Sequence, residues 1–513
     1  MKKFNEKETL VIEVGSKYVS KSEPHKIKDI FCKSSGTICK GVKKLIIGKG
    51  ISVIGDGAFM NFEDLCEVEL PSGLEKIGEN AFKNCKNLTN INIPDSVTTI
   101  DDYAFNNCTS LICVILPDDI TKIGYKAFNH CTALTEVTLP LCFEKCDGSV
   151  FYGCTSLPMI CQDGCLVAWP SASGAITLPD NITQIGKRAF YNCTSLTSVT
   201  IPKGVTKIGD NAFYNCTSLT SVTILEGVTE IGAEAFQYCK ALTSVTIPES
   251  VTKIGDRAFH DCPSLSRVNI PKGLKKLGYR AFVGCSCVPM ICIGKKLEAW
   301  PSATGIVTIP DGIDEIKDGA FSDCTGLTQV NIPKSVKKIG DYAFASCTSL
   351  SNFIIPDSIT KIGYGAFSQC TSLAKVIISD SVQEIGGAAF NECSNLTDII
   401  LSKSITEIGE WMFEGCSRLN NITIPNNVEV IGEEAFASCK SLRSITIPPN
   451  VKDIYDSAFA GCEHLKKVVI SNGVETIGKL AFAECTHLTN VVIPDSVTEI
   501  SHDAFDGCPN AEA

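Results

Sequence analysis

The sequence is short of several features that would point to common protein classes. Its 513 residues contain no run of about 18 apolar residues, the length that a membrane-spanning helix needs. Basic residues are in deficit, since 46 Lys and Arg stand against 57 Asp and Glu for a net charge of −11. A nucleic-acid binder needs basic surface to meet phosphates, so that class is disfavoured. Acidic residues interrupt the stretch after Lys2 and Lys3, and we expect no ordinary secretory signal there.

Motifs that carry chemistry are missing as well. The sequence has no HExxH, no phosphate-binding loop, no GxSxG and no dinucleotide-binding glycine run. It has six histidines, of which His464 and His487 are 23 residues apart. That spacing would stack the two rings on adjacent turns of a repeat, but no third metal ligand accompanies them. We therefore predict a non-enzymatic protein with no catalytic residues, no cofactor and no metal site.

What the sequence does contain is a regular repeat. A phenylalanine, usually in Ala-Phe, recurs nineteen times between Phe59 and Phe505, and the step is 23 residues except at two places. Those two steps, from Phe151 to Phe190 and from Phe282 to Phe321, are 39 residues long. A fixed period of this length is the signature of a solenoid, because one unit cannot bury its own apolar side whereas stacked units can.

One clean unit, at residues 196–216, reads LTSVTIPKGVTKIGDNAFYNC. The apolar alternation through Val199 and Ile201 predicts a strand, which the following proline ends. A second short extended segment is expected at 205–208, and a helical or 3₁₀ turn at 210–214 that directs the phenylalanine inward. With stacked strands about 4.8 Å apart, nineteen units would make an elongated body rather than several globules.

The pattern L-x-x-V-x-I-P-x-x-V-x-x-I-G-x-x-A-F-x-x-C resembles the BspA-type leucine-rich repeat family, which is named for a bacterial surface adhesin. The resemblance covers residues 41–508, nearly the whole chain. It implies a leucine-rich repeat solenoid, mostly β with short helical or 3₁₀ turns, whose parallel strands stack into a curved rod.

For function, the resemblance implies a cell-surface or secreted adhesin that binds an extracellular-matrix or host surface protein. An intracellular scaffold for protein–protein interactions in the cytoplasm is the alternative, because no signal peptide is seen and the chain has 28 cysteines. So many thiols fit a reducing compartment better than an oxidising one. Both readings predict a protein ligand, no nucleic acid and no membrane span.

The repeat also divides the chain. The two long steps each hold a related 16-residue insertion, in which PMIC and AWPSA recur 131 residues apart and a strand–turn–strand hairpin is expected. We expect a cap strand at 10–14, and self-association through the uncapped C-terminal end. The predicted segments are an N-terminal cap at 1–40, repeat blocks at 41–157, 180–288 and 311–513, and hairpin insertions at 158–179 and 289–310.

Eighteen cysteines stand three residues after a repeat phenylalanine, and stacking would align them in one column. We interpret this column as a structural ladder of small buried side chains. A column of disulfides or metal ligands is the alternative, but stacked parallel side chains seldom reach disulfide torsions or a tetrahedral arrangement. Representative members of the ladder are Cys85, Cys108, Cys193, Cys216, Cys347 and Cys370.

Four of the other ten cysteines stand close enough in sequence to pair. Cys161 and Cys165 flank an expected hairpin turn, and Cys32 and Cys39 could tie the N-terminal cap. The sequence leaves both disulfides open.

The outward positions of the predicted sheet give the first candidate for a binding site. In the middle repeats these positions hold Ser and Thr, but further on one of them becomes apolar in three successive units. The stacked side chains would form a stripe, which we interpret as a partner-binding site. The alternative is that β-branched residues occur there because they favour strands. The stripe comprises Ile354, Ile377 and Ile400, and Val469 and Val492 follow after two threonines.

Trp169 and Trp300 are the second candidate, because tryptophan is enriched at binding hot spots. They occupy equivalent positions in the two insertions. The alternative is that each one covers the core at the point where the repeat is interrupted.

Overall fold

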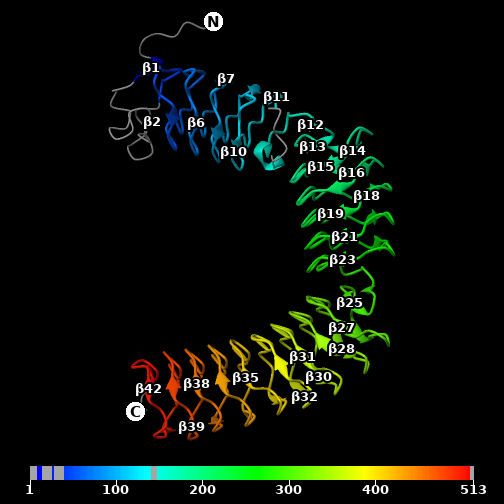
Figure 1. The fold of residues 1–513 in the computed structure, drawn as a ribbon, viewed down its shortest axis with the longest axis vertical. Coiled ribbons are helices and arrows are strands. Elements are labelled where there is room, and N and C mark those ends of the chain that lie inside the picture. The colour runs from blue at the N-terminus through cyan, green and yellow to red at the C-terminus, as the bar shows by residue number, and fades with distance from the viewer. Residues whose placement is uncertain (1–7, 14–25, 28–39, 140–146, 509–513) are drawn as a thin grey trace. The chain divides into compact units, whose positions relative to one another are not determined.

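The computed structural model of the chain describes residues 8–13, 26–27, 40–139 and 147–508 (Figure 1). Within these ranges the protein is a β-solenoid of about 20 stacked parallel coils with almost no helix, which confirms the fold predicted from the repeat. Most regular coils contribute one strand of two to six residues to one sheet and a two-residue strand to another, and turns connect the two. The chain divides into two compact units, Met1–Leu274 and Lys275–Ala513.

The first unit builds its longer strands into parallel sheets with a constant offset. These strands are β1 (Thr9–Ile12), β3 (Lys44–Ile47), β5 (Glu67–Glu69), β7 (Asn90–Asn92), β9 (Cys113–Ile115), β11 (Glu136–Thr138), β14 (Gly174–Thr177), β16 (Leu196–Ile201), β18 (Ser221–Ile224), β20 (Ser244–Thr246) and β22 (Arg267–Val268). Val222 of β18 pairs with Val199 of β16 and with Val245 of β20, each 23 residues away. Equivalent residues of successive coils therefore stack on one another.

Two-residue strands form the second set of sheets in this unit. They are β2 (Lys26–Ile27), β4 (Val53–Ile54), β6 (Lys76–Ile77), β8 (Thr99–Ile100), β10 (Lys122–Ile123), β15 (Gln184–Ile185), β17 (Lys207–Ile208), β19 (Glu230–Ile231) and β21 (Lys253–Ile254). The expected cap strand is present as β1, which pairs in parallel with β3. The rest of the predicted cap falls largely outside the described residues, as do Cys32, Cys39 and the C-terminal end at 509–513.

The second unit repeats the same plan. Its longer strands are β26 (Gly305–Thr308), β28 (Leu327–Asn331), β30 (Asn352–Ile355), β32 (Lys375–Ile378), β34 (Asp398–Ile400), β37 (Ser444–Ile447), β39 (Lys467–Ile470) and β41 (Asn490–Val492). Its two-residue strands are β23 (Lys276–Leu277), β27 (Glu315–Ile316), β29 (Lys338–Ile339), β31 (Lys361–Ile362), β33 (Glu384–Ile385), β35 (Glu407–Ile408), β36 (Val430–Ile431), β38 (Asp453–Ile454), β40 (Thr476–Ile477) and β42 (Glu499–Ile500).

The segment that carries the Ala-Phe motif is a run of turns, where the sequence had suggested a helical or 3₁₀ turn. In the coil of Phe213, alternate N–H groups leave the coil: those of Asn211, Phe213 and Asn215 donate to carbonyl oxygens of the next coil at 2.7–2.8 Å. The N–H groups between them close four-residue turns within the coil, because each donates to the carbonyl three residues earlier. Asn211 and Asn215 take left-handed φ angles of 55° and 56° to allow this alternation. A 3₁₀ helix does occur at η2 (Gly148–Phe151), just before the first insertion. We call the side of each unit that these runs of turns form, residues 210–215 in the coil of Phe213, the turn edge.

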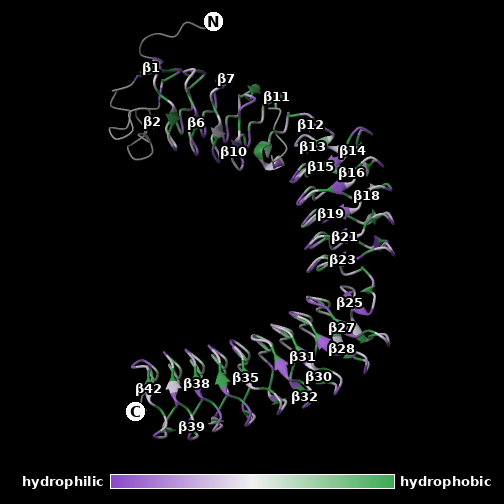
Figure 2. Ribbon diagram, viewed as in Figure 1, coloured by the Kyte–Doolittle hydropathy of each residue, from purple (hydrophilic) through white to green (hydrophobic). Residues whose placement is uncertain are grey.

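The core is a set of columns, and the phenylalanine column is its largest member. Phe190 and Phe213 stack with ring centroids 4.7 Å apart and planes 8° apart, and Phe213 and Phe236 follow at 4.9 Å and 4°. All three rings are fully buried. Apolar and polar residues alternate along each coil (Figure 2), because the inward side chains fill the interior while their neighbours face solvent. Coils approach so closely at the turn after the short strand that a Cβ on Gly232 would lie 2.6 Å from the amide nitrogen of Asp210.

Each insertion forms an additional, shorter coil. β12 (Ile160–Gln162) and β13 (Cys165–Ala168) make an antiparallel hairpin, and β13 then pairs in parallel with β15. β24 (Ile291–Ile293) and β25 (Lys296–Ala299) do the same, and β25 pairs with β27. After the first hairpin, β14 pairs with β16 at the usual 23-residue offset from Ala175 onward. The insertions therefore add material without breaking the register of the solenoid.

Candidate binding surfaces

Three isoleucines of the predicted stripe lie side by side on one sheet of the second unit. The register pairs Ile354 with Ile377 and Ile377 with Ile400, one residue from each of β30, β32 and β34. The preceding residues on these strands point inward and are buried, so the isoleucines face outward by the alternation of the strand. Ile354 is 70% exposed and Ile400 is 53% exposed, while Ile377 is half-buried between them. Three adjacent coils thus present a contiguous apolar patch to solvent.

A polar row borders this isoleucine stripe. Asn352, Lys375 and Asp398 stack beside it, and the Lys375 ammonium lies 3.1 Å from the Asp398 carboxylate. A shallow depression adjoins the stripe and is lined by Gln329, Asn331, Ser351, Asn352 and Ile354, among others. An apolar centre with a polar rim is the usual composition of a protein–protein contact.

The two valines form a separate pair. Val469 of β39 is paired with Val492 of β41, and Val492 is 57% exposed. Thr423 and Thr446 occupy the equivalent positions in the two coils between Ile400 and Val469. The valines are therefore a second patch rather than a continuation of the isoleucine stripe.

Sequence reasoning missed other exposed isoleucines on the sheet faces. Ile306 of β26 is 67% exposed and pairs with Gln329 of β28, so it lies one coil beyond the depression beside Ile354. Ile115 of β9, in the first unit, is 56% exposed at the repeat position that Ile354 holds in the second. The alternation rule that found the stripe would have found Ile115 if it had been applied to every coil.

The two tryptophans take the place of a repeat phenylalanine in the inserted coils. The N–H of Trp169 donates to the carbonyl of Ala189 at 2.8 Å, as the N–H of a repeat phenylalanine does to the next coil, and its ring lies 6.0 Å from that of Phe190. Trp300 repeats both contacts with Ala320 and Phe321. Each ring is half-buried at the end of a phenylalanine column. This geometry supports the core-covering interpretation, and neither ring lies on the isoleucine stripe.

The ladder cysteines are buried, except for Cys508, which is half-buried. The Cys216 thiol donates to the carbonyl oxygen of Phe190 at 3.1 Å, and the Cys347 thiol donates to that of Phe321 at 3.2 Å. Burial raises the pKa of Cys108 and of Cys193 to about 12, so these thiols stay protonated at neutral pH. Cys85 and Cys370 are also fully buried. Each thiol thus satisfies a carbonyl of the preceding coils while filling the core.

No group of three or more His, Cys, Asp or Glu in the described part of the chain is arranged to hold a metal ion. The rings of His464 and His487 stack at 5.2 Å, but the Nδ1 atom of each faces a backbone carbonyl, of Lys440 and Glu463 respectively. Cys161 and Cys165 are both free thiols. Among the residues described, no helix is long and apolar enough to cross a membrane.

A profile of the BspA type leucine-rich repeat region matches in six copies, at residues 35–158, 171–288, 302–420 and 383–512. No curated protein matches the chain.

Several solved structures are similar to the chain. A leucine-rich repeat protein from Bacteroides ovatus is 30% identical over 68% of this chain and 88% of its own, with a TM-score of 0.44. A leucine-rich cell surface protein from Faecalibacterium prausnitzii is 32% identical over 60% of this chain and 90% of its own, with a TM-score of 0.37. The pneumococcal vaccine antigen PcpA is 18% identical over 66% and 87%, with a TM-score of 0.42.

Proposed function

We propose a protein-binding function at the cell surface for this chain, which belongs to the BspA-type leucine-rich repeat family. A solenoid of this family is consistent with a scaffold that binds other proteins, because stacked coils offer a long, rigid surface. The finer proposal is an adhesin that engages an extracellular-matrix or host surface protein. The F. prausnitzii protein, a leucine-rich cell surface protein, supports the location by similarity.

The isoleucine stripe is the observation that carries this proposal. Ile354, Ile377 and Ile400 are held in register by backbone hydrogen bonds of the sheet, so little conformational entropy is lost when a partner covers them. Their side chains contribute little to the core, which Phe353, Val376 and their neighbours fill. A partner that buries the stripe removes this apolar surface from water, which favours binding.

The location is tested first, by protease shaving of intact source cells with an intracellular protein as the control. Loss of the chain from intact cells is the expected result. Full protection would place the chain inside the cell and would rule out the adhesin.

The contact is tested by binding of the purified chain to a panel of immobilised extracellular-matrix proteins. Ile354→Asp should reduce binding at least tenfold, because it places a charge in an apolar contact. Thr223→Asp, at the equivalent repeat position in the first unit, is the matched control and should bind as the wild type does. Equal binding by the wild type, Ile354→Asp and Thr223→Asp would show that the stripe does not contact the ligand.

An intracellular scaffold is the second candidate, and one observation favours it. Cys161, Cys287 and Cys292 are exposed free thiols, and exposed thiols persist best in a reducing compartment. Such a scaffold would use the same stripe on an intracellular partner. The protease experiment separates the two candidates.

A further inference from the structure

A ribbon of aromatic rings follows the turn edge of the first unit. Neighbouring rings touch from coil to coil: Tyr152 and Tyr191 at 5.6 Å, Tyr191 and Tyr214 at 4.9 Å, and Tyr214 and Tyr238 at 5.4 Å between centroids. The rings are half-buried or exposed, so their outer surfaces meet solvent. This aromatic ribbon comprises Tyr103, Tyr125, His130, Tyr152, Tyr191, Tyr214, Tyr238 and His260.

Cations are set among these rings. The Lys126 ammonium lies 5.0 Å from the ring centroid of Tyr125 and 4.8 Å from that of Tyr152. The Lys83 ammonium lies 5.8 Å from the ring of Tyr103. Among the described residues, no carboxylate is within 4.0 Å of either ammonium. The Arg188 guanidinium also lies 5.8 Å from the ring of Tyr125 and 5.9 Å from that of Tyr191, but it is paired with Asp147. Lys83 and Lys126 are therefore the positive charges that lie over rings of the ribbon and lack an anion among the described residues.

The composition of the ribbon is that of a protein-binding surface. Tyrosine offers a large, rigid contact at low entropic cost, and asparagine adds hydrogen bonds beside it, as in antibody combining sites. Asn192 and Asn215 lie next to the rings: Asn215 donates to Asn192 at 2.7 Å, and Asn192 donates to the Tyr152 hydroxyl at 2.9 Å. A partner that fits this surface presents carboxylates to the lysines and apolar surface to the rings.

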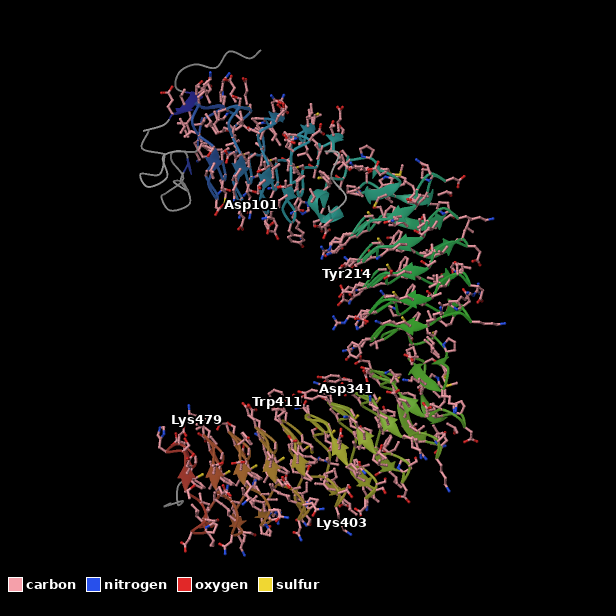
Figure 3. All side chains as sticks on the ribbon, in the orientation of Figure 1. Asp101, Tyr214, Asp341, Lys403, Trp411 and Lys479 are labelled. Atoms are coloured by element: carbon pink, nitrogen blue, oxygen red, sulfur yellow. The ribbon has the colours of Figure 1, made fainter. Side chains whose placement is uncertain are left out.

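The second unit carries such a surface on its own turn edge. Its acidic side chains there are exposed or half-buried, and none has an ion pair with a described residue. Burial and the repulsion of Glu434 and Glu392 raise the pKa of Glu414, because these carboxylates lie near one another. Trp411 lies among them, on the edge opposite Lys403 (Figure 3). This acidic edge comprises Glu392, Glu410, Glu414, Glu433, Glu434, Asp456 and Glu484.

We propose that the aromatic ribbon of one copy of this chain docks on the acidic edge of a second copy. The Lys83 and Lys126 ammoniums of the ribbon and the carboxylates of the acidic edge are opposite in sign, and none of them has an ion pair with a described residue. The ribbon supplies lysines and tyrosine rings, and the acidic edge supplies carboxylates around a half-buried tryptophan. A second copy is therefore a partner whose chemistry the chain itself already provides, and the contact is separate from the isoleucine stripe.

The repeat supplies substitutions that the fold already accepts. Lys126 and Glu434 occupy the same repeat position, with left-handed φ angles of 55° and 51°. Lys126→Glu and Glu434→Lys therefore each introduce a residue that another coil holds in the same conformation. Tyr191→Ala likewise introduces a residue that another coil already holds, because Ala437 occupies the equivalent repeat position.

The test is sedimentation velocity of the full chain between about 1 and 100 μM, at low and at high salt. The wild type should self-associate with rising concentration, and salt should weaken the association. Lys126→Glu, Glu434→Lys and Tyr191→Ala should each raise the dissociation constant at least about tenfold. The double variant Lys126→Glu with Glu434→Lys should recover association, because both surfaces have changed sign.

Lys203→Glu is the matched control, because Lys203 holds in the first unit the repeat position that Lys403 holds in the second, away from the turn edge. It should associate as the wild type does, and all variants should keep the wild-type melting temperature. A wild type that stays monomeric throughout the range overturns the proposal, even if a foreign acidic protein is found to bind the ribbon. So does self-association that the three single variants leave unchanged, or a double variant that fails to recover.

Discussion

The two units of this protein share an interior and differ on their surfaces. Phe213 of the first unit and Phe367 of the second are both fully buried, and each stacks on a neighbouring ring at 4.9 and 5.2 Å respectively. On the outer side of the sheet, however, Thr223 of the first unit stands where Ile377 stands in the second. The turn edge also changes, from aromatic and partly cationic to acidic.

The reason for this difference lies in where the stability of a solenoid comes from. Backbone hydrogen bonds between coils and the buried columns hold each coil, and neither depends on the outward side chains. The outward positions are therefore free to carry a binding surface, whereas the inward positions are not. Substitutions at equivalent repeat positions of the two units can therefore test whether the interiors are alike and the surfaces different.

The largest effect is expected in the core. Phe213→Ala and Phe367→Ala should each lower the free energy of unfolding by about 3–5 kcal/mol, because each leaves a cavity in a closely packed column. Urea unfolding followed by circular dichroism measures both, and Thr223→Ala on the exposed face serves as the control. Losses that differ by more than about 2 kcal/mol would show that the two interiors are not equivalent.

An intermediate effect is expected at an ion cluster around the half-buried Glu315 in the second unit. The Glu315 carboxylate lies 2.9 Å from the Lys296 ammonium, 3.2 Å from that of Lys338 and 3.4 Å from that of Lys317. Burial raises the pKa of Glu315, but these lysines outweigh burial and lower it to about 2. Glu315→Gln should therefore cost about 1–3 kcal/mol at pH 7.

The sign of the pH dependence follows from the lowered pKa. The contribution of Glu315 is present above the ordinary value of 4.5 and is lost as the pH falls towards about 2. Melting temperatures of wild type and Glu315→Gln between pH 7 and 2.5 should thus converge in acid. Glu230, its counterpart in the first unit, pairs with two lysines among the described residues, Lys253 at 2.6 Å and Lys207 at 3.5 Å, so Glu230→Gln should cost less. A difference in melting temperature between the wild type and Glu315→Gln that is as large at pH 2.5 as at pH 7 would contradict this explanation.

A smaller effect is expected on the sheet face. Ile377→Asp should lower stability by about 1 kcal/mol or less, because the side chain is only half-buried. Thermal unfolding measures the change, and Thr223→Asp at the equivalent position should cost no more. A loss of several kcal/mol for Ile377→Asp would show that this isoleucine belongs to the core, and the stripe would then be reduced to its two ends.

The fold could be predicted from the sequence because the same residue pattern recurs nineteen times. Alternation around Val199 gives the strand, and the strict 23-residue period gives its register. The turn edge could not be predicted in the same way. Every second N–H group there bonds to the next coil rather than back along the chain, and the sequence 210–214 looks the same in both cases.

The binding surfaces could be predicted only in part. The alternation rule placed Ile354 and Ile400 on the outside correctly, because it needs no knowledge of neighbouring coils. The aromatic ribbon escaped it, because its rings lie on the turn edge and not on the sheet face. Tyr152 and Tyr214, among others, each follow a repeat phenylalanine directly, so a search of that repeat position would have found them. Other rings of the ribbon, such as Tyr125, occupy different repeat positions, and only the stacking of the coils brings them alongside.

The smallest effect is expected on the turn edge, at a repeat position whose backbone is left-handed. An asparagine of the first unit and a leucine of the second both hold this position. Leu480 has a φ of 53° and is 38% exposed, whereas Asn211 holds the same position with a φ of 55°. Asparagine adopts this conformation readily, whereas leucine adopts it only with backbone strain. Leu480→Asn should therefore raise the free energy of unfolding by about 0.5–1 kcal/mol. Asn211→Leu should lose at least as much, because it also removes the 2.8 Å hydrogen bond to Glu234. If Leu480→Asn instead destabilises the protein, the side-chain packing of leucine outweighs its backbone strain, and the turn edge tolerates variation for a different reason from the one argued here.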